Sequence, residues 1–241
     1  MNELEMFKEP ILPKLRVAEV STCPLIQFFN VDCMEFMRSK PDKCYDLAIV
    51  DPMYDLETNY LCPGSKISTT GVKRNHIETA RKLSKLEIVS SEYFNELRRI
   101  SKEQIIWGEN YFNYDEKPKG RIIWDKINDT STFSNAEIAS CTLFKGVRIF
   151  RYMWNGMLQQ NMKNKEIRIH PFQKPVDLYR WILTKFCKHG WKIIDTHGGS
   201  MTNAIACDLE GFDLDICEID PQHFSSGVKA FEIYKSQQRL F

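Results

Sequence analysis

An acidic, a rigid and an aromatic residue, Asp51, Pro52 and Tyr54, follow the apolar run 45–50. Ligands of open α/β sheets bind at the carboxyl ends of strands, so such residues would meet a substrate there. The carboxylate and the Pro52 carbonyl could accept both N–H bonds of an amine on a ring and direct its lone pair toward an electrophile. The aromatic could stack on that ring, a contact worth roughly 1–3 kcal/mol for a base. The alternative is an ordinary Asp-Pro turn after a strand.

A second constellation, residues 192–206, has the pattern of a strand, a glycine turn and a helix. Glu218 ends the next apolar run, 19 residues after Gly199 (218 − 199 = 19). This spacing is typical of a Rossmann-like unit in which the acid hydrogen-bonds a ribose diol. Met201 and Asn203 stand where a pyrophosphate binder favours small residues, so the turn favours S-adenosylmethionine over NAD. A structural turn without a ligand is the alternative.

Short apolar runs alternate with amphipathic ones, which predicts an α/β fold with a Rossmann-like, mostly parallel sheet and helices on both faces. Strands are expected at 25–29, 45–50, 104–107, 121–124, 136–142, 147–152, 191–195 and 214–217. Helices are expected at 33–38, 91–100, 176–188, 202–209 and 221–237, with a loop at 155–165. The carboxyl ends of the strands must then position both constellations.

The composition is that of one ordinary globular domain, with 241 residues, 43% of them hydrophobic and 27% charged. Eight cysteines are scattered without a CxxC pair, so no metal site is expected. No apolar run is long enough to span a membrane, and the first residues lack the layout of a secretion signal. A cytoplasmic protein without a membrane partner is expected.

The net charge is +1, but the charges are unevenly distributed. Residues 66–85 and 145–168 each hold six Lys or Arg and one acid, whereas residues 193–228 hold seven acids and no Lys or Arg. We therefore expect a single domain, 1–241, with basic insertions at about 57–90 and 145–168 that face a nucleic acid. Ordinary solvated surface is the alternative. The residues predicted to contact the nucleic acid are Lys73, Arg74, Arg81, Lys82, Arg148, Arg151, Lys163 and Lys165.

Taken together, these segments resemble the β class of amino-methylating DNA methyltransferases, including phage and prophage members. In that class a catalytic D/S-P-P-Y/W motif precedes the glycine-rich cofactor motif, as residues 51–54 precede residues 195–200 here. Residues 170–175, His-Pro-Phe-Gln-Lys-Pro, resemble the H-P-x-Q-K-P element of the class, and residues 218–221 resemble its E-I-D-P. Residues 30–33 are similar to its G-D-C element, and the similarity covers roughly residues 25–235.

The resemblance implies methyl transfer from S-adenosylmethionine to an exocyclic amine of a base flipped out of double-stranded DNA. It implies that Asp51, Pro52 and Tyr54 are catalytic. The residues expected to bind the cofactor are Asp32, Lys174, Asp195, His197, Gly198, Gly199, Ser200 and Glu218. An aspartate at the first motif position favours N6 of adenine. A homodimer and a cognate restriction endonuclease, as in restriction-modification systems, are further partners to consider.

Two positions depart from the pattern of the class. Met53 replaces its second proline, and Met201 replaces the last glycine of its G-S-G turn. Three alternatives therefore stay open. They are an N4-cytosine DNA methyltransferase, an RNA or protein amine methyltransferase, and a catalytically decayed protein that still binds the cofactor and DNA. The basic insertions and residues 170–175 favour DNA over RNA or protein.

Overall fold

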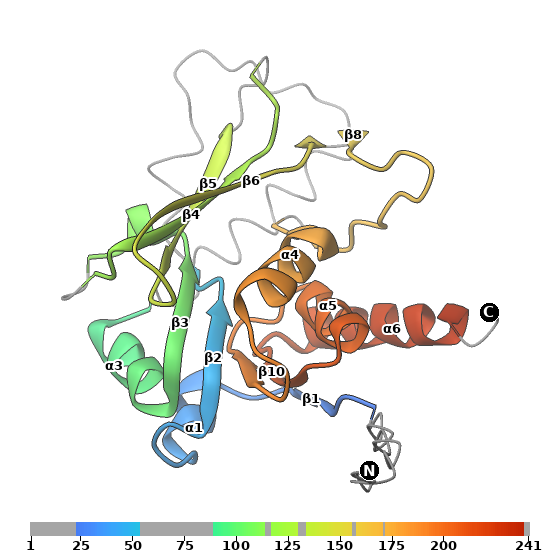
Figure 1. Cartoon of the computed structure of the whole chain (residues 1–241). Helices are drawn as coiled ribbons and strands as arrows, with labels where there is room; N and C mark the ends of the chain where they lie inside the picture. Colours follow the sequence, from blue (N-terminus) through green and yellow to red (C-terminus); the bar gives the residue numbers. More distant parts are fainter. Residues whose placement is uncertain are drawn as a thin grey trace, which may run out of the picture.

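The computed structural model describes residues 23–53, 89–113, 117–129, 134–155, 158–170 and 172–238. Within these ranges, helices pack on both faces of a mainly parallel sheet (Figure 1), as predicted. The catalytic candidate Tyr54 lies outside them. So do four of the basic residues predicted to contact DNA, Lys73, Arg74, Arg81 and Lys82.

In the described part of the chain, the main sheet has eight strands in the order β1-β10-β9-β2-β3-β5-β4-β6. The first five are parallel: β1 (Ile26–Phe29), β10 (Asp213–Cys217), β9 (Lys192–Asp195), β2 (Tyr45–Val50) and β3 (Ser101–Trp107). β5 (Ala136–Cys141) runs antiparallel between β3 and β4 (Gly120–Asp125), and β6 (Gly146–Arg151) is parallel to β4. A separate pair, β7 (Trp154–Asn155) and β8 (Leu158–Gln159), lies partly in the segment expected as a loop.

The helices form two layers. α1 (Cys33–Arg38) and α3 (Ser91–Ile100) lie on one side of the sheet, and α4 (Val176–Phe186), α5 (Thr202–Glu210) and α6 (Pro221–Gln238) lie on the other (Figure 1). A short 3-10 turn, η1 (Glu109–Tyr111), follows β3. The predicted helix at 33–38 and strand at 45–50 have the observed bounds, whereas β3 begins three residues before the predicted start at 104.

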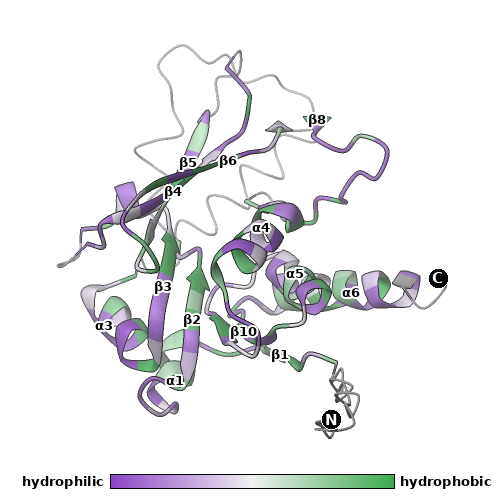
Figure 2. Cartoon of the chain, in the orientation of Figure 1, coloured by the Kyte–Doolittle hydropathy of each residue, from purple (hydrophilic) through white to green (hydrophobic). Residues whose placement is uncertain are grey.

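Alternating side chains of the central strands fill two cores. Leu47 and Ile49 of β2 pack into the core beneath α4 and α5, while Ala48 and Val50 pack into the core beneath α3. All four are at most 1% exposed. A strand buried on both faces needs a continuous apolar sequence, and Figure 2 shows this hydrophobic stretch in the parts of β2 and β3 that lie toward their arrowheads. The carboxyl ends of these strands are therefore held rigidly.

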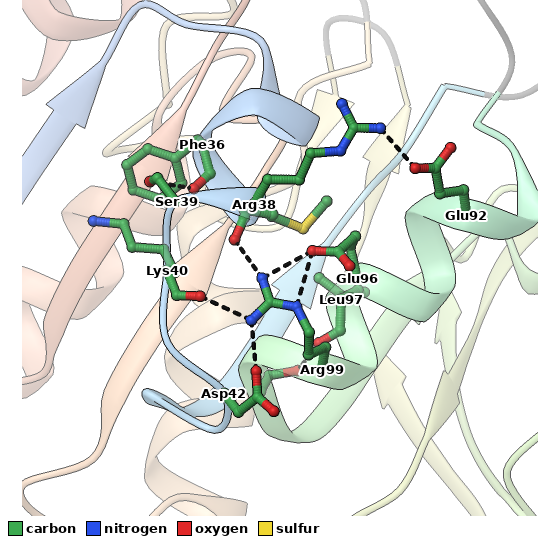
Figure 3. Close-up of polar contacts among 11 residues, drawn as sticks. Phe36, Arg38, Ser39, Lys40, Asp42, Glu92, Glu96, Leu97 and Arg99 are labelled. Atoms are coloured by element: carbon green, nitrogen blue, oxygen red, sulfur yellow. Dashed lines mark hydrogen bonds and ion pairs between the residues drawn. The ribbon is translucent and has the colours of Figure 1, made fainter.

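Arg99 of α3 contacts α1 and the loop that follows it (Figure 3). The Arg99 guanidinium donates to the carbonyls of Met37 and Lys40, each at 2.8 Å, and to the carboxylate of Asp42 at 2.7 Å. It also contacts Glu96 on its own helix at 2.8 Å. The planar fork of arginine suits such multiple acceptors. Arg99 thereby fixes the loop that leads from α1 into β2.

We expect Arg99→Met to lower the free energy of unfolding by about 1–3 kcal/mol, because two main-chain carbonyls lose their charged donor. Urea denaturation followed by circular dichroism measures this change. Arg38→Met is the control, since it removes an exposed ion pair with Glu92, whose two side chains are 57% and 62% exposed. Such pairs contribute little. Equal effects of the two substitutions would contradict a linking role for Arg99.

Candidate active site

Acidic residues follow four neighbouring strands at one edge of the sheet. β1, β10, β9 and β2 are adjacent and parallel, so their carboxyl ends lie side by side. Asp32, Glu218, Asp195 and Asp51 stand at or just beyond these ends. This is the position where open α/β sheets bind ligands. The structure therefore places the two predicted constellations next to each other.

Glu218 anchors the glycine turn. Its Oε2 accepts the Gly199 N–H at 2.8 Å, and its Oε1 accepts the Asp220 N–H at 2.9 Å. Gly199 has a φ of +50°, a left-handed conformation that glycine adopts without penalty. Because a carboxylate oxygen has two acceptor sites, each oxygen of Glu218 can still accept a hydroxyl hydrogen from a ligand.

Asp195 also supports this glycine turn, and it is itself only 3% exposed. Its Oδ1 accepts the His197 N–H and its Oδ2 accepts the side-chain amide of Asn203, both at 3.0 Å. Burial raises the pKa of Asp195 to about 7, although these two hydrogen bonds oppose the shift. Asn203, which departs from the dinucleotide pattern, is thus the partner that this buried carboxylate requires.

A chain of polar contacts that begins outside the sequence motifs supports His197. The Tyr93 hydroxyl lies 2.6 Å from Thr196 Oγ1, which lies 2.9 Å from His197 Nδ1. The Tyr93 and His197 rings also meet edge to face, with centroids 5.4 Å apart. Burial lowers the pKa of His197 to about 4, so its imidazole is neutral at neutral pH. Thr196 belongs to the motif 195–200, but Tyr93 belongs to no recognisable motif, and only the folded chain brings it to Thr196.

Met201 has a left-handed backbone conformation, which glycine adopts without penalty. Its φ is +58° and its side chain is fully buried. The methionine fills space left by two glycines, because a Cβ on Gly198 would lie 2.7 Å from Met201 Sδ and a Cβ on Gly227 would overlap Met201 Cγ. Ser200, also buried, lies 3.3 Å from Thr202 through their hydroxyl oxygens. The departure from the family pattern is therefore accommodated by packing.

Asp32 is exposed, and its carboxylate caps a helix. Its Oδ1 accepts the N–H groups of Met34 and Glu35 at 2.8 and 3.0 Å, and so caps α1. A carboxylate at a helix N-terminus is stabilised by the unpaired N–H groups and the helix dipole. In the structure this residue lies beyond β1, two strands from the glycine turn that follows β9.

His170 and Lys174 of the segment 170–175 lie next to the glycine turn and Asp51, respectively. The His170 ring lies against Gly199, where a Cβ would be 3.7 Å from its Nδ1, and its centroid is 4.6 Å from that of His223. Burial, aided by His223, lowers the pKa of His170 to about 3. At the other end of the segment, Lys174 forms an ion pair with Asp51. Lys174 was expected beside the cofactor, and the structure pairs it with the catalytic candidate.

Four charged groups form a chain at this point. Lys174 Nζ contacts Asp51 Oδ2 and lies 2.9 Å from Glu137 Oε2, while Lys126 Nζ lies 2.6 Å from Glu137 Oε1. Burial raises the pKa of Asp51, and the Lys174 ammonium opposes the rise. Burial also acts to raise the pKa of Glu137, but Lys174 and Lys126 lower it to about 2. Glu137 had no distinguishing signal in the sequence.

The remaining predicted residues that the structure describes are Pro52, which is buried, and the basic residues of 145–168. Arg148, Arg151, Lys163 and Lys165 are all exposed. Arg151 ends β6 at the same edge as Asp51, and its Nε lies 3.2 Å from Asp125 of β4. The chain beyond it stays close to the charged cluster, because the Trp154 N–H donates to the Lys126 carbonyl at 3.4 Å.

Within the described ranges, no group of three or more His, Cys, Asp or Glu side chains could hold a metal ion. In the same residues, no helix is both long and apolar enough to cross a membrane.

No protein-family model and no curated protein matches this chain. Among solved structures, PvuII DNA methyltransferase (cytosine-N4-specific) is similar, with a TM-score of 0.54, 10% identity and coverage of 87% of each chain. TTHA0409 of Thermus thermophilus, a proposed DNA modification methylase solved with S-adenosyl-L-methionine, has a TM-score of 0.50 and 14% identity, with 86% of this chain and 93% of that chain covered. These likenesses show the fold, which is the Rossmann-like fold of S-adenosylmethionine-dependent methyltransferases.

We expect Met201→Gly to be at least as stable as Met201→Ala. Both lose the packing of a buried methionine, which lowers the free energy of unfolding by about 2–5 kcal/mol. Glycine alone avoids the strain of a left-handed residue, about 1–2 kcal/mol. Urea denaturation compares the two variants. At Met37, buried in helix α1, the order should reverse, because glycine destabilises a helix by about 1 kcal/mol relative to alanine. The same order at both sites would disprove the backbone argument.

Proposed function

We propose that this protein is a DNA methyltransferase that transfers the methyl group of S-adenosylmethionine to N6 of an adenine flipped out of the duplex. The proposal rests on one observation, the parallel register of β2 and β9. Ala48 pairs with Ile194, so the two strands end side by side, with Asp51 directly after β2 and Asp195 as the last residue of β9. Neighbouring strands are about 4.8 Å apart. An amine held by Asp51 therefore lies next to a ligand held by the glycine turn.

The protein supplies hydrogen-bond acceptors for both N–H groups of the amine. Asp51 Oδ2 is bonded to Lys174, which leaves Oδ1 for one N–H of the amine, and the Pro52 carbonyl accepts the other. Bound S-adenosylmethionine supplies an electrophilic methyl group on a sulfonium. The amine nitrogen forms the new C–N bond while the electrons of the C–S bond leave with sulfur, and the methylated nitrogen releases one proton to water. Alignment of the two reactants supplies much of the rate.

Cofactor binding is proposed for the edge of the sheet where the four acidic residues follow their strands. Glu218 would accept the ribose hydroxyls, Asp32 the adenine amine, and residues 195–200 would line the methionine part. His197 is neutral at neutral pH, so it adds no positive charge next to the sulfonium. Gly198 and Gly199 allow the backbone to approach the ligand closely.

DNA binding is proposed for the exposed residues Arg148, Arg151, Lys163 and Lys165, together with Lys73, Arg74, Arg81 and Lys82. Cations of this kind bind phosphates without reading sequence. Arg151 supports this role because it lies at the edge where Asp51 lies. Tyr54 is proposed to stack on the flipped base. A cytoplasmic location, a homodimer and a cognate restriction endonuclease stay predictions of the sequence.

Cytosine N4 is the second candidate for the acceptor, since a structural neighbour is named as cytosine-N4-specific. The first motif residue, Asp51, favours adenine by resemblance to the family pattern. Both reactions use the same hydrogen-bond acceptors for an exocyclic amine, so only the identity of the methylated base distinguishes them.

Expression in a host without DNA methylation, followed by modification-sensitive genome sequencing, tests the reaction. We expect N6-methyladenine at a defined motif, and a loss of about 100-fold or more in rate for Asp51→Ala, because a preorganised acceptor is removed. Asp42→Ala is the matched control, an aspartate with a 76% exposed side chain in the loop between α1 and β2. Detection of N4-methylcytosine instead would mean that the acceptor base is cytosine and not adenine. No mark in the presence of bound cofactor would favour the decayed-protein alternative.

Cofactor binding has its own test. We expect Glu218→Gln to weaken S-adenosylmethionine binding by about 10–100-fold, because a hydrogen bond to a charged group contributes roughly 1.5–3 kcal/mol. Isothermal titration calorimetry measures the dissociation constant. Glu210→Gln, at the end of α5, should leave it unchanged. Unaltered affinity in Glu218→Gln would mean that another residue accepts the ribose hydroxyls.

A further inference from the structure

Glu137 occupies a position that the reaction as described above does not use. It belongs to β5, the antiparallel strand of the main sheet, and its carboxylate lies between two lysines. Lys126 follows β4, and Lys174 precedes α4. Through Lys174, Glu137 is one ammonium group away from Asp51. Residues from four separate parts of the chain thus alternate in charge as Asp51, Lys174, Glu137 and Lys126.

The surroundings leave Lys174 little freedom. Its side chain is 3% exposed, and its ammonium lies 5.3 Å from the centre of the Trp107 ring. Lys126 is similarly placed 5.0 Å from the Trp124 ring. A buried ammonium requires anionic partners in good geometry. Glu137 and Asp51 supply them, so the ammonium lies between the two carboxylates, on Oδ2 of Asp51 and Oε2 of Glu137.

We propose that Glu137 is a positioning residue for methyl transfer, which holds the Lys174 ammonium on Oδ2 of Asp51 so that Oδ1 stays directed at the amine. This inference rests on the proposed function, because it concerns the group that accepts the amine hydrogens. An ionised Asp51 accepts a hydrogen bond with both oxygens, whereas a protonated one carries a competing donor. Glu137 itself does not touch the substrate in this arrangement.

Five titratable groups face Asp51 from the elements packed around it. They are Lys174, Glu137, Lys126, Tyr179 of α4 and Asp195 of β9. Among the charged neighbours, Lys174 and Lys126 lower the pKa of Asp51, and Glu137 raises it. Loss of the lysine and loss of the glutamate should therefore shift this pKa in opposite directions. A merely structural contribution of either residue to packing would not produce opposite shifts.

The pH dependence of kcat tests this inference. Activity requires ionised Asp51, so it is present above the pKa of Asp51 and is lost as the pH falls through it. We expect Glu137→Gln to move this acidic limb to lower pH and to reduce kcat by about 10–100-fold, because Lys174 is no longer held in place. The KM for S-adenosylmethionine should change less than about twofold, an order-of-magnitude expectation for a residue outside the cofactor turn. Lys174→Met should move the limb to higher pH.

Two further variants serve as controls. Glu137→Asp keeps the charge, so it should leave the acidic limb near its wild-type position. Glu103→Gln makes the same substitution on β3, where Glu103 contacts Thr142 and not the charged chain, and should change neither the limb nor kcat. Thermal melts by circular dichroism establish that each variant is folded.

Titration of the carboxyl groups by carbon-13 NMR separates this inference from the proposed function. Asp51→Asn identifies the Asp51 signal, and no substrate is needed. A lower Asp51 pKa in Glu137→Gln and a higher one in Lys174→Met support the positioning role even if the wild-type protein methylates no DNA. An Asp51 pKa that is equal in wild type and Glu137→Gln, or an unchanged kcat in an active enzyme, would overturn it.

Discussion

Backbone pairing between four parallel strands is the constraint on which the candidate active site depends. β1, β10, β9 and β2 run side by side in the same direction, so residues that follow them must emerge at one edge. Because β2 is buried on both faces, it cannot slip or tilt without disrupting two cores. The distance between Asp51 and the glycine turn is thereby set by the spacing of strands and not by flexible loops.

That arrangement concentrates negative charge, and each acid is stabilised by a different partner. Asp32 accepts N–H groups at the start of a helix, Glu218 accepts N–H groups of the glycine turn, and Asp195 is bonded to an asparagine amide. Of these four acids, only Asp51 has an ammonium partner within the described residues. Because their partners differ, the four carboxylates differ in the hydrogen bonds that they can still accept.

The departures from the family pattern illustrate how packing and backbone conformation compensate one another. Met201 adopts a left-handed φ that costs about 1–2 kcal/mol for such a residue, yet its side chain fills the space beside two glycines. The burial of a methionine contributes a comparable or larger amount. The turn therefore accommodates a residue that the sequence pattern alone would mark as disruptive.

Local pattern alone determined the order of strands and helices, the sites where Asp51, Asp195 and Glu218 end their strands, and the resemblance to a methyltransferase family. These features follow from hydrophobic periodicity and short motifs, which act between near neighbours in the chain. Tertiary structure alone decided the antiparallel direction of β5, the pairing of Lys174 with Asp51, and the position of Glu137 between two lysines. Glu137 and Asp51 are distant in sequence and share no motif, so only the packing of β5 beside β3 and β4 brings their charges onto one ammonium group.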